Sequence, residues 1–399
     1  MNTPDSGRGR VALCIAHCVG LLDLTALPLW IAVLVKHFKF DPQQAGALVT
    51  LFLIGGVLAS VAVAPAFARM ATGRWWAAAG FTLAAVAFYL MIDASGFWPM
   101  AALHAVGGVG IGLALSMTHG TVARSSRPHR LFAVCGTAQG VFALAFMVSV
   151  PTFMEIQGSV LLLKIFAAIT LFGALSTLVG FPPPMPIGGA SGVAETGQTT
   201  RSAPIPRVVW AGVFGLVFMS MVQAMTFSFL ERTGADRGLA AGQVAMVLGL
   251  LGMVNLFPAA LAGLLERRFE ARSVLMVAPV LQALLAALLF LSSTFLPYAV
   301  AGSLFVAMII FAHVFGFGLL ARLDTSGRVL SATPAMMMTG AAIGPVVAGT
   351  LVKVSGYPAV GMVALVIGLV SLFCFARLPR TAAAAPTPAA AVLKSAASH

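Results

Sequence analysis

Long runs of apolar residues, separated by short polar segments, form the main pattern of this chain. Each run has about 20 residues, the length that an α-helix needs to cross the hydrocarbon core of a bilayer. Membrane-spanning helices are expected at residues 11–35, 45–66, 75–93, 98–119, 131–152, 159–181, 208–230, 240–264, 273–293, 297–320, 329–352 and 357–377. The pattern therefore predicts an all-α membrane protein with about twelve transmembrane helices.

The longest internal polar segment, 182–207, is rich in Pro, Gly, Ser and Thr and has six predicted spans on each side. This layout predicts an N-terminal six-helix lobe over 1–181, a cytoplasmic linker over 182–207 and a C-terminal six-helix lobe over 208–378. The Ala-, Ser- and Pro-rich segment 379–399 is expected to be a disordered cytoplasmic tail.

The composition agrees with a membrane protein, because 60% of the 399 residues are hydrophobic and only 9% are charged. Soluble domains carry roughly 25% charged residues. The net charge of +12 does not indicate a nucleic-acid partner, since most Lys and Arg residues fall in the loops on one side of the predicted membrane. The charge bias instead predicts that both termini are cytoplasmic, in a multi-pass protein of the inner (cytoplasmic) membrane.

Two loop segments carry the remains of one motif. Segment 66–74 ends in Gly73 and Arg74, and these two residues match the end of the Gly-x-Leu-x-Asp-x-x-Gly-Arg loop that follows helix 2 in the major facilitator superfamily. Met70 replaces the Asp of that pattern. A second copy after the eighth span keeps its basic residues, Arg267 among them, but not the internal Gly.

The spacing of Gly340, Gly344 and Pro345 in the predicted helix 329–352 looks like the Gly-rich proline motif of helix 11 in the same superfamily. With the layout of two six-helix halves, the chain resembles the major facilitator superfamily over essentially its whole length. The resemblance implies two lobes that expose a central cavity to each side in turn, in a branch similar to drug/proton antiporters or sugar-efflux proteins. Small residues at this spacing also let helices pack closely, which is the simpler interpretation of these glycines.

Asp23 lies near the middle of the first predicted span. A charged carboxylate there costs about 2.5–3.5 kcal/mol on insertion scales, so a site that alternates between protonated and ionised forms is a natural use for it. The resemblance implies the same role, because many proton-coupled relatives have an acid in helix 1. It also implies that His104, which stands where the family has Arg in helix 4, assists proton exchange. The alternative is that Asp23 is a protonated hydrogen-bonding group between helices.

Further polar residues within the predicted spans are candidates to line a substrate cavity, since such groups usually face the bundle interior. These residues are Gln223, Asn255, His313 and Lys164. For Lys164, reaching the membrane interface is the alternative.

A cluster of sulfur-containing side chains suggests a different substrate class. Cys14, His17 and Cys18 share one stretch of the first span, and Met221 and Met225 are spaced i, i+4 in the seventh. Soft sulfur ligands select copper(I). Met is also a common filler of hydrophobic cores, which is the competing interpretation.

The sequence thus predicts a proton-coupled secondary active transporter of a small solute, with export of small organic or toxic compounds as the expected direction. Alternatives are a proton-coupled uptake permease for a small metabolite, a transporter of copper or another metal ion, and a membrane sensor or scaffold that does not transport. No nucleophile–base pair or phosphate loop lies at a membrane face, so an enzyme is not expected. The expected partners are the substrate, protons and the lipid bilayer, with a monomeric chain, no cofactor and no nucleic acid.

Overall fold

The computed structural model describes residues 3–63, 73–183, 206–265, 268–323 and 333–379. The helices of this part of the chain are α1 Gly7–Gly20, α2 Leu22–Lys36, α3 Pro42–Val63, α4 Gly73–Met91, α5 Phe97–Ala123, α6 Pro128–Gln157, α7 Leu161–Gly180, α8 Arg207–Asp236, α9 Ala241–Val254, α10 Pro258–Leu265, α11 Ala271–Leu291, α12 Phe295–Leu323, α14 Thr333–Ser355 and α15 Tyr357–Ala376. Within these described ranges the chain contains no β-strand.

Two of the expected spans are each built from two helices. The helices α1 and α2 follow one another with a break at Leu21, and α9 and α10 are separated at residues 255–257. If each broken pair is counted as one rod, eleven rods of the described chain are long and apolar enough to cross a bilayer. The twelfth, α4, has 19 residues and packs between α5 and α7. The prediction of an all-α membrane protein with about twelve spans is therefore confirmed.

Local sequence explains where several helices begin. The Ser6 hydroxyl caps α1 by accepting a hydrogen bond of 3.1 Å from the Gly9 N–H. Pro128 and Pro358 each occupy the first turn of a helix, where the missing N–H of proline costs no hydrogen bond. Asp41 and Gln44 form a reciprocal cap at the start of α3, each accepting a hydrogen bond from the other's backbone N–H.

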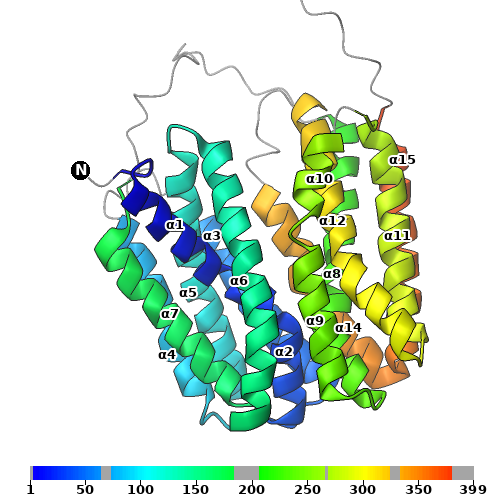
Figure 1. The fold of residues 1–399 in the computed structure, drawn as a ribbon, viewed down its shortest axis with the longest axis horizontal. Helices are drawn as coiled ribbons and strands as arrows, with labels where there is room; N and C mark the ends of the chain where they lie inside the picture. Colours follow the sequence, from blue (N-terminus) through cyan, green and yellow to red (C-terminus); the bar gives the residue numbers. More distant parts are fainter. Residues whose placement is uncertain (1–2, 64–72, 184–205, 266–267, 324–332, 380–399) are drawn as a thin grey trace, which may run out of the picture.

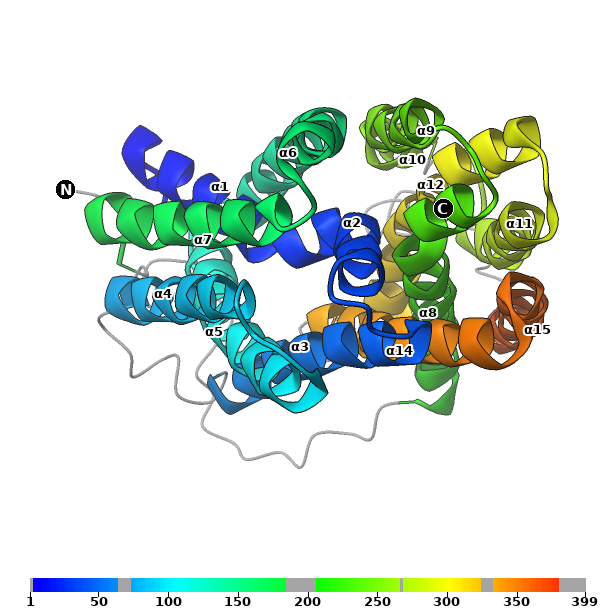
Figure 2. The same ribbon diagram turned by 90° about the horizontal axis from the view of Figure 1, so that it is seen from below.

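The helices form two groups, α1–α7 and α8–α15, which stand side by side in Figure 1. Seen from below in Figure 2, α2 and α3 of the first group lie beside α8 and α14 of the second. We refer to these groups as the N-terminal and C-terminal lobes. Most of the predicted linker and nearly all of the predicted tail lie outside the described residues, so those boundaries stay predictions.

Large apolar side chains remain exposed over much of the described surface. Trp98 is 80% exposed, Leu264 78% and Val179 69%. A water-soluble monomer rarely exposes apolar surface on this scale. The exposed side chains are the surface that lipid would cover, and this fits the membrane-length rods.

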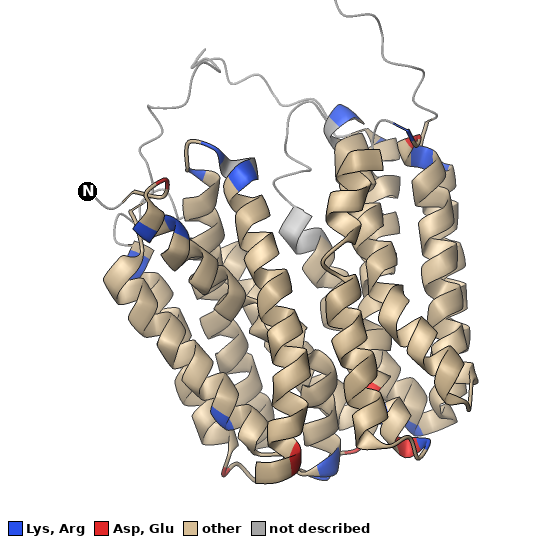
Figure 3. Cartoon of the chain, viewed as in Figure 1, with Lys and Arg blue, Asp and Glu red and all other residues tan. Residues whose placement is uncertain are grey.

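Lys and Arg residues gather mainly at one end of the helices, the end that carries the N-terminus (Figure 3). We call this the basic end. The helices α1, α6 and α8 begin there and α5 and α7 end there. The other end, where α2 ends and α3 begins, is called the opposite end.

Candidate functional site

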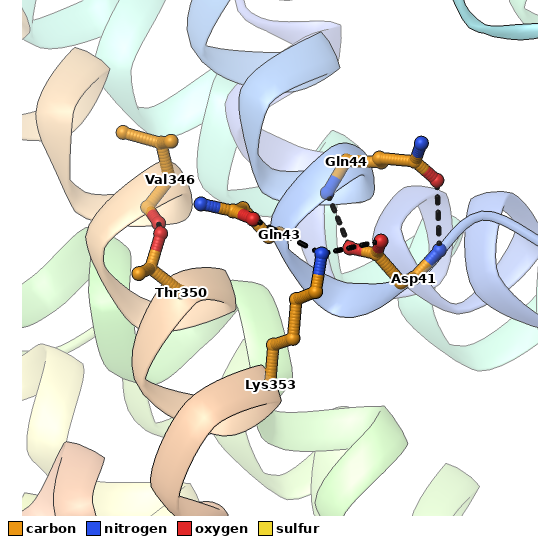
Figure 4. Close-up of polar contacts among 6 residues, drawn as sticks. All are labelled: Asp41, Gln43, Gln44, Val346, Thr350 and Lys353. Carbon is orange, nitrogen blue, oxygen red and sulfur yellow. Dashed lines mark hydrogen bonds and ion pairs between the residues drawn. The ribbon is translucent and has the colours of Figure 1, made fainter.

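The two lobes are joined at the opposite end by an ion pair. The Lys353 ammonium of α14 donates hydrogen bonds of 2.9 Å to Asp41 Oδ2 and 3.2 Å to Gln43 Oε1 (Figure 4). Asp41 precedes α3, so the contact ties the start of one lobe's helix to the end of the other's. The Asp41 carboxylate also accepts the Gln44 N–H at 2.9 Å, which fixes its orientation toward Lys353.

Backbone contact between α3 and α14 accompanies this ion pair. A Cβ atom at Gly46 would collide with the Pro345 carbonyl, and one at Gly349 would collide with the Pro42 carbonyl. Glycine is therefore required at both positions while the lobes are in contact. On the neighbouring face of α14, Gly344 packs on α8, where an added Cβ would lie 2.6 Å from Ala224 Cβ.

Near the basic end, α6 lines an open cavity of about 690 Å³. Its lining residues lie mainly on one face of that helix: Arg130, Ala133, Val134, Thr137, Ala138, Val141 and Phe142. Further along the same helix, Leu144 and Val148 contact Gly252 and Gly249 of α9. The face of α6 that lines the cavity is therefore the same face that, further along the helix, contacts α9 of the other lobe.

The break between α1 and α2 places Asp23 in the first turn of α2. Its side chain is buried, with only 5% of the residue exposed, and Oδ1 has no hydrogen-bond partner. The first turn of a helix favours negative charge, because its free N–H groups carry partial positive charge. A buried carboxyl oxygen without a partner is costly, so this atom is available to a proton, a water molecule or a ligand.

Two polar residues stand beside this turn. Gln139 Nε2 of α6 donates a hydrogen bond of 2.7 Å to Thr25 Oγ1, which in turn donates one of 3.0 Å to the Leu21 carbonyl. The Gln139 Oε1 atom is buried and unpartnered. We call Asp23 together with this Thr25–Gln139 pair the Asp23 group. Residues two apart in a helix point to different faces, so the pair is linked to Asp23 through the backbone of α2.

His104 lies elsewhere in the same lobe. Its Nδ1 donates a hydrogen bond of 2.7 Å to the Met100 carbonyl, and its buried Nε2 has no partner. The ring stacks on Trp30 with centroids 5.2 Å apart, in a cluster of aromatic side chains. Neither ring nitrogen forms a hydrogen bond with Asp23, which lies about two helical turns before Trp30 in α2.

The other predicted cavity residues occupy three different settings. Gln223 accepts a hydrogen bond of 3.3 Å from Gln282 within the C-terminal lobe. Asn255 lies at the break between α9 and α10 with a buried, unpartnered Oδ1, and His313 has a buried, unpartnered Nε2 and a ring stacked on Phe317. Lys164 is exposed near the start of α7, a position that fits a side chain reaching the membrane interface.

The sulfur-containing residues are not assembled as the sequence suggested. Cys14 Sγ lies 3.5 Å from Cys135 Sγ, a residue of α6, while Met221 and Met225 pack against the glycine face of α14. His17 Nδ1 and His119 Nε2 are 3.0 Å apart. In the part of the chain that the structure describes, no group of three or more His, Cys, Asp or Glu side chains is placed to hold a metal ion.

A family model described as the Major Facilitator Superfamily matches residues 13–323 of the chain. The chain belongs to the major facilitator superfamily. It is therefore a multi-pass membrane transporter rather than an enzyme. No curated protein matches the chain.

Solved structures of superfamily transporters share this fold. The nucleoside transporter NupG has a TM-score of 0.70 at 16% identity, covering 92% of this chain and 97% of that one. A D-xylose-proton symporter gives 0.71 at 14% identity, with 93% and 98% covered. A bacterial homolog of the human lysosomal transporter Spinster, inward-facing and occupied, gives 0.69 at 12%, with 97% and 100% covered. At these identities the similarity concerns the fold alone.

The superfamily loop motif is only partly described. Gly73 begins α4, and the Arg74 guanidinium lies 5.2 Å from the centroid of the Trp75 ring. Residues 64–72 and Arg267 lie outside the described residues. The proposed gating contacts of this superfamily loop therefore stay a prediction.

Sequence reasoning missed several polar residues of this superfamily member. Glu231 of α8 has a buried, unpartnered Oε2, and it lies at the edge of the predicted span 208–230, where an acid is easily assigned to a loop. Gln139 lies in a predicted span and could have been found as an intramembrane polar residue. The pairing of Asp41 with Lys353 joins residues 312 positions apart and had no local signal.

Proposed function

We propose that this superfamily transporter is coupled to protons and that Asp23 is the proton-binding residue. The observation that carries the proposal is the buried carboxyl group of Asp23, whose Oδ1 has no partner, at a break in the first membrane-spanning rod. Intramembrane acids of this kind are costly, and they commonly mark ion or proton pathways. A residue kept only to join helices would be expected to have its hydrogen bonds satisfied.

The Asp23 group supports a change of protonation without a large rearrangement. When Asp23 is protonated, its hydroxyl can donate a hydrogen bond to a water molecule or to the solute, since Oδ1 has no partner in the protein. When Asp23 is ionised, the start of α2 stabilises the negative charge. For His104 we propose an indirect part, in which it holds the Trp30 ring in α2, rather than direct proton exchange with Asp23.

For the substrate we propose a small organic solute held between the lobes. Asn255 and His313 each keep a buried polar atom without a partner, and with Gln223 they supply donors and acceptors from the C-terminal lobe. Two of the similar structures name nucleosides and D-xylose as solutes, so these classes come first in a substrate panel. Export remains the expected direction on sequence grounds, with uptake as the alternative.

Lobe contact at the opposite end and the cavity near the basic end together fit one state of an alternating-access cycle. If the basic end lies on the cytoplasmic side of the inner membrane, as its excess of Lys and Arg favours, this state is open to the inside. The Asp41–Lys353 ion pair would then close the outer side and break when the transporter opens outward. We expect a monomer to carry out this cycle.

The first experiment reconstitutes the full-length protein in liposomes. Nucleosides, pentoses, amino acids, organic anions and lipophilic cations are tested for uptake and for export, each with and without an imposed pH gradient. We expect accumulation of one class to depend on the gradient. A chain that binds compounds but moves none of them, with or without a gradient, would instead be a sensor or scaffold.

A further inference from the structure

Cysteine and histidine side chains of three helices meet within the N-terminal lobe, apart from the Asp23 group. Cys14 of α1 faces Cys135 of α6, with sulfur atoms 3.5 Å apart. His17 of α1 faces His119 of α5, with ring nitrogens 3.0 Å apart. The proposed transport mechanism uses neither pair.

The two pairs are neighbours. His17 follows Cys14 by three residues, so both lie on one face of α1. On α6, Phe132 precedes Cys135 by the same spacing, and its ring contacts His119 with centroids 5.5 Å apart. The thiol pair and the imidazole pair therefore lie about one helical turn apart in the layer between α1, α5 and α6.

The two thiols differ in their exposure. Cys135 is fully buried, whereas Cys14 is partly exposed. Cys18, one turn further along α1, is partly exposed too and lies close enough for a charge on it to interact with Cys14 and Cys135. A small ion could reach the pair through Cys14, while the buried sulfur would hold it away from solvent.

The donor set restricts which ion fits. Structural zinc sites use four ligands, and among the described residues no group of three suitable side chains converges. Soft sulfur ligands favour soft monovalent ions, which are stable with only two thiolates. We propose that Cys14 and Cys135 bind one soft monovalent metal ion of the Cu(I) and Ag(I) class.

The binding step balances without an oxidant. Two metal–sulfur bonds form as the two thiol protons leave to solvent, and the metal keeps its oxidation state. The resulting complex carries one negative charge. The neighbouring imidazole pair supplies polar surroundings, and His17 Nδ1 and His119 Nε2 are already engaged with each other.

The test measures silver binding to the purified full-length protein in detergent, with a phosphine reductant that keeps the thiols reduced. Silver per chain is measured after gel filtration, and the melting temperature is recorded, because a ligand of the folded state raises it. We expect one Ag(I) per chain in the wild type. Cys14→Ser and Cys135→Ser should each weaken binding by at least about tenfold.

Matched controls are present in the chain. Cys374→Ser, in α15, and Cys18→Ser should keep one ion per chain, as should His17→Gln. Wild-type affinity in Cys14→Ser, or loss of binding in Cys18→Ser or His17→Gln, would overturn the two-thiol assignment. If Cys135→Ser fails to fold, the partly exposed Cys14→Ser still decides the result. Because the readout is binding, its failure would leave the proposed transport function untouched.

Discussion

Lys353 of the C-terminal lobe donates a hydrogen bond of 2.9 Å to Asp41 of the N-terminal lobe. The pair lies at the opposite end, where α3 and α14 are in backbone contact, whereas the cavity lies near the basic end. It is the kind of contact that exists in one state of an alternating-access cycle and is absent in the other. Its strength therefore affects the balance between the two states.

Breaking this ion pair should shift the lobes toward separation at the opposite end. Both side chains are partly exposed, 44% for Lys353 and 34% for Asp41, so the pair contributes at most about 1 kcal/mol. Lys353→Met should therefore change the equilibrium by up to about fivefold. Spin labels on cysteines at Lys39 and Ser355, in a background without native thiols, would report the change as a larger long-distance population.

The charge-swapped double variant Asp41→Lys with Lys353→Asp is the control for that experiment. It restores an attractive pair and should return the distances toward those of the wild type. If Lys353→Met and the double variant give the same distribution as the wild type, the pair has no influence on the conformational balance.

The ion pair should also respond to pH, but only in strong acid. Partial burial raises the pKa of Asp41, yet the hydrogen bonds from the Gln44 N–H and the Lys353 ammonium outweigh burial and hold this pKa below its usual range. A depressed pKa means that the contribution is complete above the pKa of an unpaired Asp, about 3.9, and is lost as pH falls through the lower value.

The same label pair should therefore show no change attributable to Asp41 between about pH 8 and pH 5. Below about pH 4 the wild type should move toward the distribution of Asp41→Asn, which already lacks the charge. If the distance distributions of the wild type and Asp41→Asn already coincided near neutral pH, that result would contradict the depressed pKa of Asp41.

Close packing of α14 on α8 gives a prediction about stability. A Cβ at Gly340 would collide with the Val217 carbonyl and lie 2.9 Å from the Met221 N. Gly340→Ala should therefore destabilise the protein by about 1–3 kcal/mol, seen as a lower melting temperature in detergent. Gly136→Ala is the matched control, since an added Cβ there meets no atom within 4 Å. Equal melting temperatures for the two variants would contradict the packing role.

Thr25 should act as a positioning residue for the Asp23 group. Thr25→Val removes the acceptor of the Gln139 amide and leaves a buried donor unpaired, at a cost of about 1–3 kcal/mol. Gradient-driven transport should fall by about tenfold or more, while exchange of solute without a gradient should fall less. Thr25→Ser keeps the hydroxyl and should restore coupling, whereas failure of that rescue would indicate a purely structural effect.

Much of the fold follows from the sequence because long apolar runs have few alternatives to membrane-spanning helices. The break before Pro258 also had a local signal, since a residue that precedes proline is disfavoured in a helix. The break at Leu21 had none of comparable strength. It is accompanied by close packing of Gly20, where an added Cβ would lie 2.7 Å from Leu115 Cδ1, and such a contact depends on the tertiary structure.

The site was predictable in part for the same reason. An acid within an apolar run stands out, so Asp23 could be identified from the sequence alone. The contact between Gln139 and Thr25 could not be predicted, because the two residues lie 114 positions apart along the chain and meet only through helix packing. The stacking of His104 on Trp30 depends on packing too, and no sequence pattern indicated it.

Asp23 is the residue that we propose carries the coupled proton. The most direct measurement records proton movement with a pH-sensitive dye trapped inside proteoliposomes, when the solute identified in the panel is added in the absence of a gradient. We expect solute-induced proton movement in the wild type, none in Asp23→Asn, and retained exchange of labelled solute in that variant. Proton movement at the wild-type rate in Asp23→Asn would contradict this proposal.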